Sequence, residues 1–240
     1  MFLSLAFVTG LVALAKGQTL TGQYDCATQG NYQLCNNQWG TSAGTGSQTA
    51  TLNGVNGNSV SWSTQWNWSG GDNSVKTYSN ISPTTGMGSA LSAITTAPTT
   101  WQWAYSDTSN VRADVSYDIW IGTTPDGAQA SAQSSYEIMI WLSGQGGIQP
   151  IGSKTASANI GGHQWDVWTG PNSNWQVISF LTTEGDITNF SADLNDFFKY
   201  IIASNGVNSG LFLQTIESGT EPFTGSATLT TTGYSVSVSS

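Results

Sequence analysis

Glutamate is scarce in this chain, and the position of Glu137 is the first indication of chemistry. The chain has four glutamates, at positions 137, 184, 217 and 221. Glu137 lies within an apolar segment, residues 135–142, where the alternation of side chains along a strand puts Glu137, Met139 and Trp141 on one face. A carboxylate beside a thioether and an indole is typical of a cleft floor on which a flat, partly apolar ligand lies against Trp141. An ordinary solvent-facing strand position is the alternative, and it is disfavoured because charged residues make up only 8% of the chain.

A second carboxylate candidate lies near the C-terminus, in the sequence Gly-Thr-Glu-Pro-Phe-Thr-Gly of residues 219–225. The glycines and the proline set the course of the backbone around Glu221, which is how a side chain is aimed in one direction. Glu217 is the rival for the same role, and spacing alone does not decide between the two. A solvated turn charge is the alternative for both. Glu184 lies in a polar turn, residues 183–186, and we do not expect it to take part in chemistry.

Charge and composition argue against several other kinds of function. The formal net charge is −9, from 5 basic and 14 acidic residues, which argues against nucleic acid as a partner and suits a neutral ligand in an acidic medium. His163 is the only histidine, so the sequence supports neither a zinc cluster nor a Ser/His/Asp triad. No glycine-rich phosphate loop is present in the sequence. We therefore expect no metal and no cofactor.

The first residues of the chain are typical of a secretory signal peptide. Residues 2–15 form an apolar run that is too short to span a bilayer, and small residues occupy the two positions that a signal peptidase recognises, Ala15 and Gly17. This predicts a signal peptide over residues 1–17 and a mature chain that begins at Gln18. The protein is then expected to be secreted and extracellular, with no membrane partner.

Two further features agree with export. Cys26 and Cys35 are the only cysteines, and in an oxidising compartment they are expected to form one disulfide that closes a small hairpin loop. Acceptor sequons for N-glycosylation begin at Asn67, Asn80 and Asn189.

Nearly every periodic stretch behind this leader has a period of two residues. Apolar or aromatic residues alternate with polar ones over residues 60–68 and 111–121, and both stretches are predicted to be half-buried strands. Further strands are predicted over residues 156–160, 164–168, 176–182, 210–216, 225–230 and 234–238. Because glycine-rich turn signals separate these short strands, we expect an all-β antiparallel sandwich. No linker or repeat divides the 240 residues, so residues 18–240 are expected to form a single domain.

One segment has helical instead of strand periodicity. Its apolar residues at helical spacing are Leu194, Phe197, Phe198, Ile201 and Ile202. Ser191 is the predicted N-cap, Asp193 is favourable near the positive end, and Gly206 can end the helix. We expect one amphipathic helix packed on the outside of a sheet.

The segments around Glu137 and Glu221 also carry a resemblance to a known family. Residues 136–141 (Tyr-Glu-Ile-Met-Ile-Trp) and 219–225 look like the two signatures of glycoside hydrolase family 12, secreted endo-β-1,4-glucanases and xyloglucanases. Further matching segments follow in family order at residues 36–40, 66–71, 75–78, 117–118 and 148–152. The resemblance implies a β-jelly roll of two curved antiparallel sheets with a long substrate cleft on the concave face.

The resemblance also implies roles for individual residues in a retaining hydrolysis. Glu137 would be the nucleophile, Glu221 the general acid/base, and Asp118 the aspartate that supports the nucleophile; a retaining pair lies about 5 to 5.5 Å apart. Trp39 and Trp141 would stack on sugar rings, with core packing as the alternative for both, and Asn37 would bind sugar hydroxyls. The residues expected to shape the cleft near the cleavage point are Met139, Pro150 and Phe223. Glu217 departs from the family pattern, which has a neutral residue there, and its charge would raise the proton affinity of Glu221 if the two side chains approach.

Three functions remain in competition at this point. The first is a monomeric endo-β-1,4-glucanase whose substrate is a β-glucan polysaccharide: cellulose, mixed-linkage glucan or xyloglucan. The second is a secreted glutamic peptidase, which would lack the paired Glu137 and Glu221 motifs. The third is a non-catalytic carbohydrate-binding sandwich. Substrate preference within the first depends on loops such as residues 81–87 and 171–175, whose shapes a single sequence does not determine.

Overall fold

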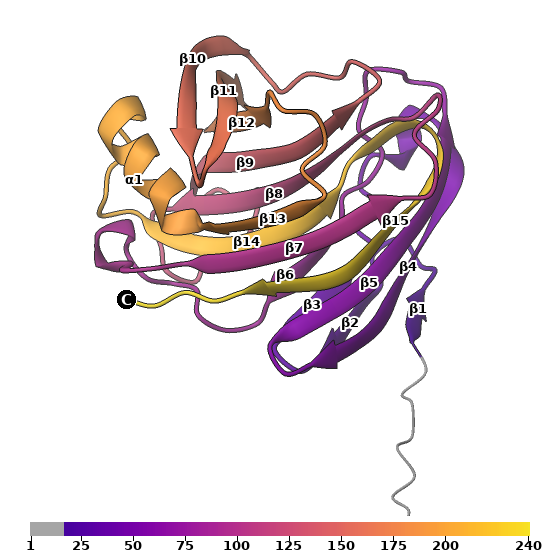
Figure 1. The fold of residues 1–240 in the computed structure, drawn as a ribbon, viewed down its shortest axis with the longest axis horizontal. Coiled ribbons are helices and arrows are strands. Elements are labelled where there is room, and N and C mark those ends of the chain that lie inside the picture. Colours follow the sequence, from indigo (N-terminus) through magenta and orange to yellow (C-terminus); the bar gives the residue numbers. More distant parts are fainter. Residues whose placement is uncertain (1–16) are drawn as a thin grey trace, which may run out of the picture.

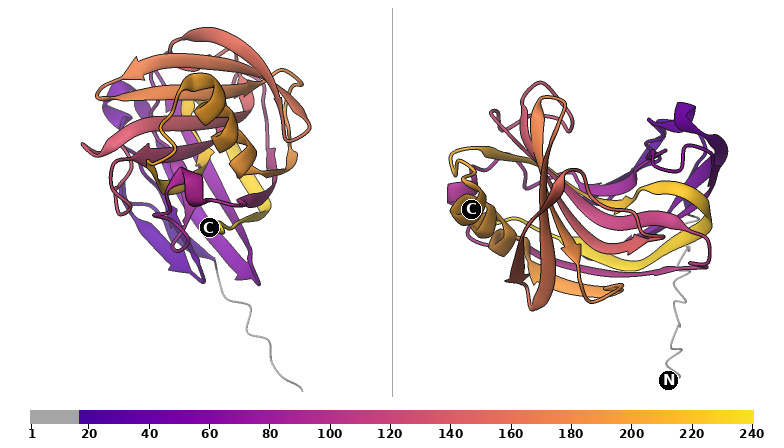
Figure 2. Two further views of the ribbon diagram at one scale, coloured as in Figure 1. Left: turned by 90° about the vertical axis from the view of Figure 1, so that its left-hand side faces the viewer. Right: turned by 90° about the horizontal axis from the view of Figure 1, so that it is seen from above.

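The computed structural model describes residues 17–240, which form two curved β-sheets packed face to face (Figures 1 and 2). The predicted signal peptide lies almost entirely outside the described residues. The first sheet has the spatial order β1 (Gln18–Leu20), β4 (Thr45–Asn56), β5 (Ser59–Ser69), β15 (Pro222–Val236), β7 (Pro98–Tyr105) and β13 (Asn189–Asp193). The second has the order β2 (Cys26–Gln29), β3 (Tyr32–Cys35), β6 (Ser79–Pro83), β14 (Phe212–Thr220), β8 (Arg112–Gly122), β9 (Ser134–Gln145), β12 (Trp175–Thr182), β11 (His163–Asn172) and β10 (Ser153–Ile160). Two short 3₁₀ helices, Thr41–Ala43 and Leu91–Ala93, lie in loops.

The predicted antiparallel sandwich is confirmed, with one parallel pair. β9 and β12 run parallel, and the pairs of the orders above are otherwise antiparallel. β15 joins the two sheets, because its first residues pair with β8 and its later residues pair with β5. Gly225 lies at this transition with φ +118°, and a Cβ there would meet the backbone of Asn110 and Val111. A glycine is therefore required where the strand leaves one sheet for the other.

Large aromatic and aliphatic side chains from both sheets fill the space between them. Trp62 on β5 and Trp101 on β7 come from the first sheet, and Tyr117 on β8 comes from the second. The rings of Trp101 and Tyr117 meet edge to face with centroids 5.1 Å apart. Such pairs contribute roughly 0.5–1.5 kcal/mol beyond the area that they bury.

β5 has the predicted half-buried pattern, whereas β8 does not. On β5, Val60, Trp62 and Trp66 are buried and alternate with exposed or partly exposed polar residues. On β8 the residues from Ala113 to Gly122 are buried on both faces, so the prediction of a half-buried strand was wrong there. Its apolar face packs in the core. Its polar face, which includes Asp118, is also buried, on the other side of the sheet.

The helix α1 (Leu194–Asn205) packs across one end of the second sheet (Figure 1). Its Phe197 ring meets Phe180 of β12 with centroids 5.0 Å apart, so the predicted apolar face is buried. The predicted stop is also confirmed, since Gly206 has the left-handed conformation with φ 70°. The predicted N-cap at Ser191 was wrong: Ser191 pairs with Thr100 of β7 within β13, and Asp193 caps the helix.

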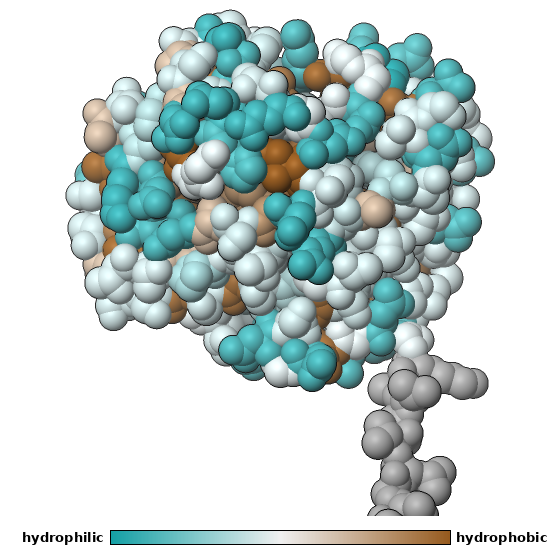
Figure 3. Space-filling model, in the orientation of Figure 1, coloured by the Kyte–Doolittle hydropathy of each residue, from teal (hydrophilic) through white to brown (hydrophobic). Residues whose placement is uncertain are grey.

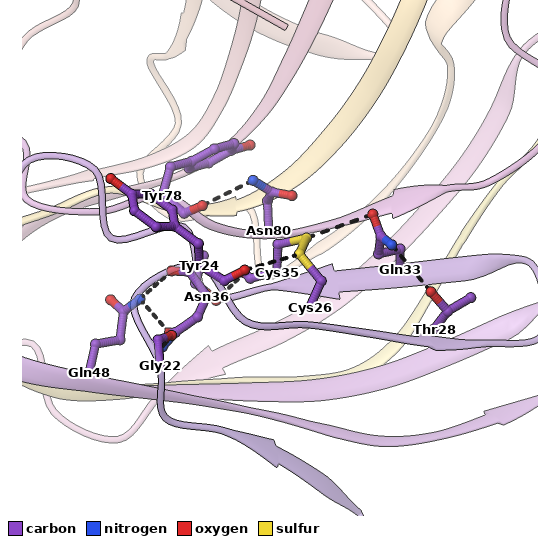
Figure 4. Close-up of a disulfide and its surroundings, with 11 residues drawn as sticks. Gly22, Tyr24, Cys26, Thr28, Gln33, Cys35, Asn36, Gln48, Tyr78 and Asn80 are labelled. Carbon is purple, nitrogen blue, oxygen red and sulfur yellow. Dashed lines mark hydrogen bonds between the residues drawn. A yellow bond between two sulfur atoms is a disulfide. The ribbon is translucent and has the colours of Figure 1, made fainter. Parts of the chain in front are cut away.

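The disulfide is formed as predicted. Cys26 and Cys35 face each other across the β2–β3 hairpin and are bonded (Figure 4). Of the sequon asparagines, Asn67 and Asn189 are exposed, whereas Asn80 is buried in β6.

The surface seen in the orientation of Figure 1 is mostly hydrophilic or neutral, with hydrophobic residues in small separate spots (Figure 3). Among residues 17–240, no helix has the length and hydrophobicity needed to cross a bilayer.

Candidate active site

A cavity of about 440 Å³ lies over the polar face of the second sheet and collects most of the acidic and aromatic candidates. Its lining residues are Asn37, Trp39, Tyr78, Asp118, Trp120, Gln129, Ala130, Glu137, Asn172, Trp175, Glu217 and Glu221. Another hollow, of about 390 Å³, is lined mainly by Asn, Ser, Thr, Pro and Gly and by no carboxylate. Of these two, only the first cavity offers carboxyl groups for acid/base chemistry. No cluster of His, Cys, Asp and Glu in the described part of the chain could hold a metal ion.

The strand register brings the carboxylates onto one face. Glu217 of β14 lies directly opposite Asp118 of β8, and Glu137 of β9 lies opposite Trp120 of β8. Because Asp118 and Trp120 are two residues apart on β8, their side chains share a face with both glutamates. Asp118 is then a diagonal neighbour of Glu137, within the distance at which cross-strand side chains interact.

Glu137 is buried and receives two hydrogen bonds at one oxygen. Its Oε2 accepts a bond of 2.6 Å from Trp175 Nε1 and a longer one of 3.5 Å from Asn172 Nδ2. Both donors flank the turn of the β11–β12 hairpin: Asn172 is the last residue of β11, and Trp175 is the first of β12. Burial raises the pKa of the Glu137 carboxyl, and the bonds from Trp175 and Asn172 lower it in part. The N–H donors thus stabilise the ionised form of this carboxylate.

Glu221, in contrast to Glu137, lies among negatively charged groups and receives no such hydrogen bonds in the described chain. It occupies the single position between β14 and β15, and its backbone N–H donates to Asp114 Oδ1 over 2.8 Å. Within residues 17–240, no N–H or O–H group of another side chain or of the backbone donates to its carboxyl oxygens. Burial raises the pKa of Glu221 well above its usual value, and the negative charges of Asp114, Glu137 and Asp118 raise it further. The surroundings of Glu221 therefore favour the protonated form of its carboxyl group.

Asp118 and Glu217 complete the acidic face. Asp118 Oδ2 accepts a bond of 3.1 Å from Trp120 Nε1, and burial, followed by the charge of Glu137, raises the pKa of Asp118. Burial and then the charge of Glu137 raise the pKa of Glu217 to about 8. The amide nitrogen of Gln129 can be oriented to donate to Glu217. Both glutamates that competed in the sequence thus line the cavity: Glu217 lies opposite Asp118, and Glu221 lies beside Asp114.

The exposed aromatic ring of Trp39 lies at the rim of the cavity. Trp39 is 54% exposed, and the nearby Asn37 has the left-handed conformation with φ 42°, which asparagine tolerates well. Backbone hydrogen bonds with residues 76–78 hold this segment in place: Tyr78 N donates to Asn37 O, and Gly40 N donates to Lys76 O. Lys76 is itself buried, with Nζ donating to the carbonyls of Gly71, Ser74 and Phe223.

Four of the predicted site residues are not among those that line the cavity. Met139 and Trp141 are buried in a small cluster with Ile148 and Val177, and Phe223 packs against that cluster. Trp141 is only 2% exposed, and its Nε1 donates to Met139 Sδ. Pro150 is also buried. Their roles in binding sugar stay predictions.

Several lining residues were missed by the sequence analysis. Trp120 has the same strand parity as Asp118, so its place on the polar face could have been found by alternation. Asn172 and Trp175 lie within the 171–175 loop that was expected to influence specificity. By contrast, the 81–87 loop contributes Pro83, Thr85 and Gly86 to the other hollow.

Comparison with known proteins gives one consistent answer. A model of glycosyl hydrolase family 12 matches residues 30–239. The xyloglucan-specific endo-beta-1,4-glucanase A of Aspergillus aculeatus is 45% identical over 240 residues, covering 98% of each chain. The enzyme of the same name from Emericella nidulans is 44% identical over 245 residues, covering 99% of this chain and 98% of that one.

Solved structures agree with these relatives. Endoglucanase 3 of Trichoderma harzianum, from family GH12, superimposes with a TM-score of 0.88 at 38% identity, covering 95% of this chain and 100% of that one. The catalytic domain of Humicola grisea Cel12A, in complex with a soaked thio cellotetraose, has a TM-score of 0.88 at 36% identity, covering 92% of this chain and 99% of that one.

Proposed function

Because this chain belongs to glycosyl hydrolase family 12 and is an endo-β-1,4-glucanase of that family, we propose that it hydrolyses xyloglucan with Glu137 as nucleophile and Glu221 as acid/base. The observation that carries the residue assignment is the contrast between the two carboxyl groups in one cavity. Glu137 accepts from Trp175 and Asn172, whereas Glu221 has no such donor in the described chain and faces another carboxyl group. An ionised and a protonated glutamate are what a retaining hydrolysis needs at the start of its cycle.

The reaction would then proceed in two steps. In the first, the Glu137 carboxylate attacks the anomeric carbon while Glu221 gives its proton to the departing glycosidic oxygen, and a covalent glycosyl-enzyme forms. In the second, the Glu221 carboxylate takes a proton from water as that water attacks the same carbon and releases Glu137. Two inversions give net retention. Asp118, held by Trp120, would support the Glu137 carboxylate through a shared hydrogen bond when Asp118 carries a proton.

The substrate proposal rests on the relatives. Two curated proteins of 45% and 44% identity are named xyloglucan-specific, and they cover nearly the whole chain. Unbranched β-1,4-glucan is the second candidate, supported by the Humicola grisea structure soaked with thio cellotetraose. Residues 171–175 supply Asn172 and Trp175 to the cavity lining, and differences there would be expected to influence which glucan backbones fit.

Initial rates on matched polysaccharides test this proposal. Xyloglucan, mixed-linkage β-glucan and carboxymethyl cellulose would be compared by reducing-sugar release, with casein as a control for peptidase activity. We expect xyloglucan to be cleaved fastest and casein not at all. Faster cleavage of the unbranched glucans would overturn the xyloglucan proposal, and binding without hydrolysis would favour the carbohydrate-binding alternative.

We also propose that the enzyme is secreted as a monomer after removal of residues 1–17. The disulfide between Cys26 and Cys35 is consistent with an oxidising compartment. N-terminal sequencing of the secreted protein should begin at Gln18, and light scattering should give the mass of one chain. Retention of residues 1–17, or a dimer mass, would contradict these proposals.

A further inference from the structure

Asp114 is a buried carboxyl group that the two-step mechanism does not use. Its exposed fraction is 0%, and it lies two strand residues beyond Ser116 and four beyond Asp118 on β8. In the register of β14 on β8, Glu217 is opposite Asp118 and Gly219 is opposite Ser116. The same register continues past the end of β14, because Asp114 N donates to Glu221 O over 3.2 Å. Asp114 and Glu221 are thus cross-strand neighbours.

Asp114 holds Glu221 through both its backbone and its side chain. Besides the backbone bond, Asp114 Oδ1 accepts from Glu221 N over 2.8 Å. Thr220, the residue before Glu221, also binds Asp114. Its Oγ1 donates to Asp114 O over 2.6 Å and forms a further hydrogen bond with the hydroxyl of Tyr105. The backbone at Glu221 is therefore fixed by Asp114 on one side, although Glu221 belongs to neither flanking strand.

The second carboxyl oxygen of Asp114 is free to interact with the Glu221 carboxyl group. Asp114 Oδ2 is buried and has no hydrogen-bond donor in the described chain. Asp114 is fully buried and Glu221 is partly buried, so ionisation of both neighbouring carboxyl groups is unfavourable, and one shared proton removes that cost. Burial raises the pKa of Asp114 to about 7 although hydrogen bonding with Glu221 lowers it in part, and the side-chain bond with Asp114 adds to the raised pKa of Glu221.

Among residues 17–240, no ion pair joins a cationic side chain to Asp114 or Glu221. The titratable groups that face Glu221 are Asp114 and Asp118 from β8, Glu137 from β9, and Tyr78 from the segment before β6. Tyr105 of β7 faces Asp114. Two cationic side chains of neighbouring segments are engaged elsewhere: Lys76 Nζ binds three carbonyl oxygens, and Arg112 binds Asp72 O, Gly146 O and Asn73 Oδ1.

We propose that Asp114 is a positioning residue for the acid step, which fixes the backbone of Glu221 and keeps a proton on the Glu221 carboxyl group until the glycosidic oxygen departs. The inference rests on the proposed role of Glu221 as acid/base. It explains why this glutamate stands opposite another carboxyl group instead of a donor. It also gives a reason for the protonated resting state that the mechanism requires.

The pH dependence of Asp114→Asn tests the proposal. Asparagine retains an oxygen that can accept from Glu221 N, but it cannot share a proton as a carboxyl group does. We expect the basic limb of the kcat/KM profile on xyloglucan to move to lower pH by about one unit, so that activity at pH 7 falls about tenfold. Hydrolysis of 2,4-dinitrophenyl β-cellobioside, whose leaving group needs no proton, should keep its wild-type pH profile. Asp107→Asn, which removes a fully exposed carboxylate, is the matched control and should change neither profile.

Three outcomes would decide against the proposal. An unchanged basic limb on xyloglucan would remove the proton-holding role, and an equal loss on both substrates at every pH would show a merely structural role. Glu221→Gln is measured in parallel and should lose activity on xyloglucan while still releasing dinitrophenolate in a first turnover. If Glu221→Gln releases no dinitrophenolate, the assignment of Glu221 and the inference about Asp114 are both wrong. If Glu221→Gln releases it but the pH profile of Asp114→Asn is not shifted, only the inference about Asp114 is wrong.

A measurement on the wild-type enzyme covers the case in which Asp114→Asn does not fold. In a ¹³C NMR titration of the carboxyl carbons, Asp114 and Glu221 should each respond in the same two steps, because a coupled pair titrates with shared values. Independent single-step titrations would overturn the proposal.

Discussion

Glu137 and Glu221 are chemically identical side chains, and the groups around them separate their protonation states. Trp175 and Asn172 donate to Glu137 and favour its anion. Asp114 faces Glu221, and burial raises the pKa of Glu221 well above its usual value. These contacts favour the anion of Glu137 and the protonated form of Glu221, which is the division that the proposed mechanism needs.

Glutamine at either position should abolish turnover of polysaccharide while the fold remains intact. Glu221→Gln removes the proton donor and should lower kcat by roughly 10²–10⁴-fold, the usual contribution of general acid/base catalysis. Glu137→Gln removes the nucleophile and should cost at least as much, although its amide oxygen can still accept from Trp175. Steady-state rates and circular dichroism check both variants. Wild-type turnover in one of them would remove that residue from the mechanism.

At this scale the sequence predicted the two glutamates better than their neighbours. Scarcity of charge and a resemblance to two short signatures pointed to Glu137 and Glu221, and both line the cavity. Trp175 and Asn172 were not assigned, because they reach Glu137 from a hairpin whose parallel pairing with β9 is not readable from local periodicity. Trp141 has the parity expected of a cleft residue, yet it is covered by Ile148 and Val177, which come from other segments.

For the strands and the helix around the site, the sequence predicted the type of secondary structure better than the residues at which each element begins and ends. Strand alternation identified β5, β8 and β9, and helical spacing identified α1. β15 was predicted as two strands, over residues 225–230 and 234–238, but it is one strand with an irregularity between Thr231 and Tyr234. Pairing with both β5 and β7 keeps it continuous, and such tertiary pairing overrides a local turn signal such as Gly233.

The start of α1 gives a prediction at this scale. Asp193 accepts from Asn195 N at the helix start and also from Thr96 Oγ1 and Ala97 N, so it caps the helix and ties it to the segment before β7. Asp193→Ala should destabilise the protein by about 0.5–2 kcal/mol for the cap alone, and by more because two further bonds are lost. Denaturant unfolding measures the change.

Two control variants separate the cap from other effects. Asp193→Asn retains an accepting oxygen and should lose much less stability than Asp193→Ala. Ser191→Ala, at the position that the sequence wrongly favoured as the N-cap, should be close to neutral. If Ser191→Ala cost more than Asp193→Ala, the cap assignment would be wrong.

The whole molecule combines an acidic chain with a buried acidic face. Its formal charge is −9, and the cleft contains carboxyl groups whose pKa values burial raises, among them Asp114 to about 7 and Glu217 to about 8. The sequence gives the net charge directly, and its strand pattern predicted the sandwich. It could not predict that Asp118 and Glu217 lie directly opposite one another, because that depends on the register between strands almost a hundred residues apart.

These raised pKa values predict how stability depends on pH. The unfolded carboxyl groups titrate near pH 4, whereas Asp114 and Glu217 retain protons to about pH 7 and 8 in the folded state. Between these limits the folded state binds more protons, so their contribution to stability is present below about pH 4 and is lost as pH rises toward 8. We expect Tm to be higher at pH 5 than at pH 8.

Glu217→Gln checks the origin of this dependence. The variant lacks one of the raised groups, so calorimetry should show a smaller fall in Tm from pH 5 to pH 8 than in the wild type. Glu184→Gln, which changes an exposed glutamate, should retain the wild-type difference apart from the loss of its charge beside His163. A Tm that rises with pH in the wild type would contradict the prediction.

The most direct test of the central claim is to trap the covalent intermediate. The enzyme would be inactivated with 2,4-dinitrophenyl 2-deoxy-2-fluoro-β-cellobioside, which forms the glycosyl-enzyme quickly and releases it slowly, and the labelled peptide would be sequenced by mass spectrometry. The account predicts one fluorosugar per chain, attached to Glu137, and no label in Glu137→Gln. A label on Glu217, Glu221 or Asp118 would contradict it.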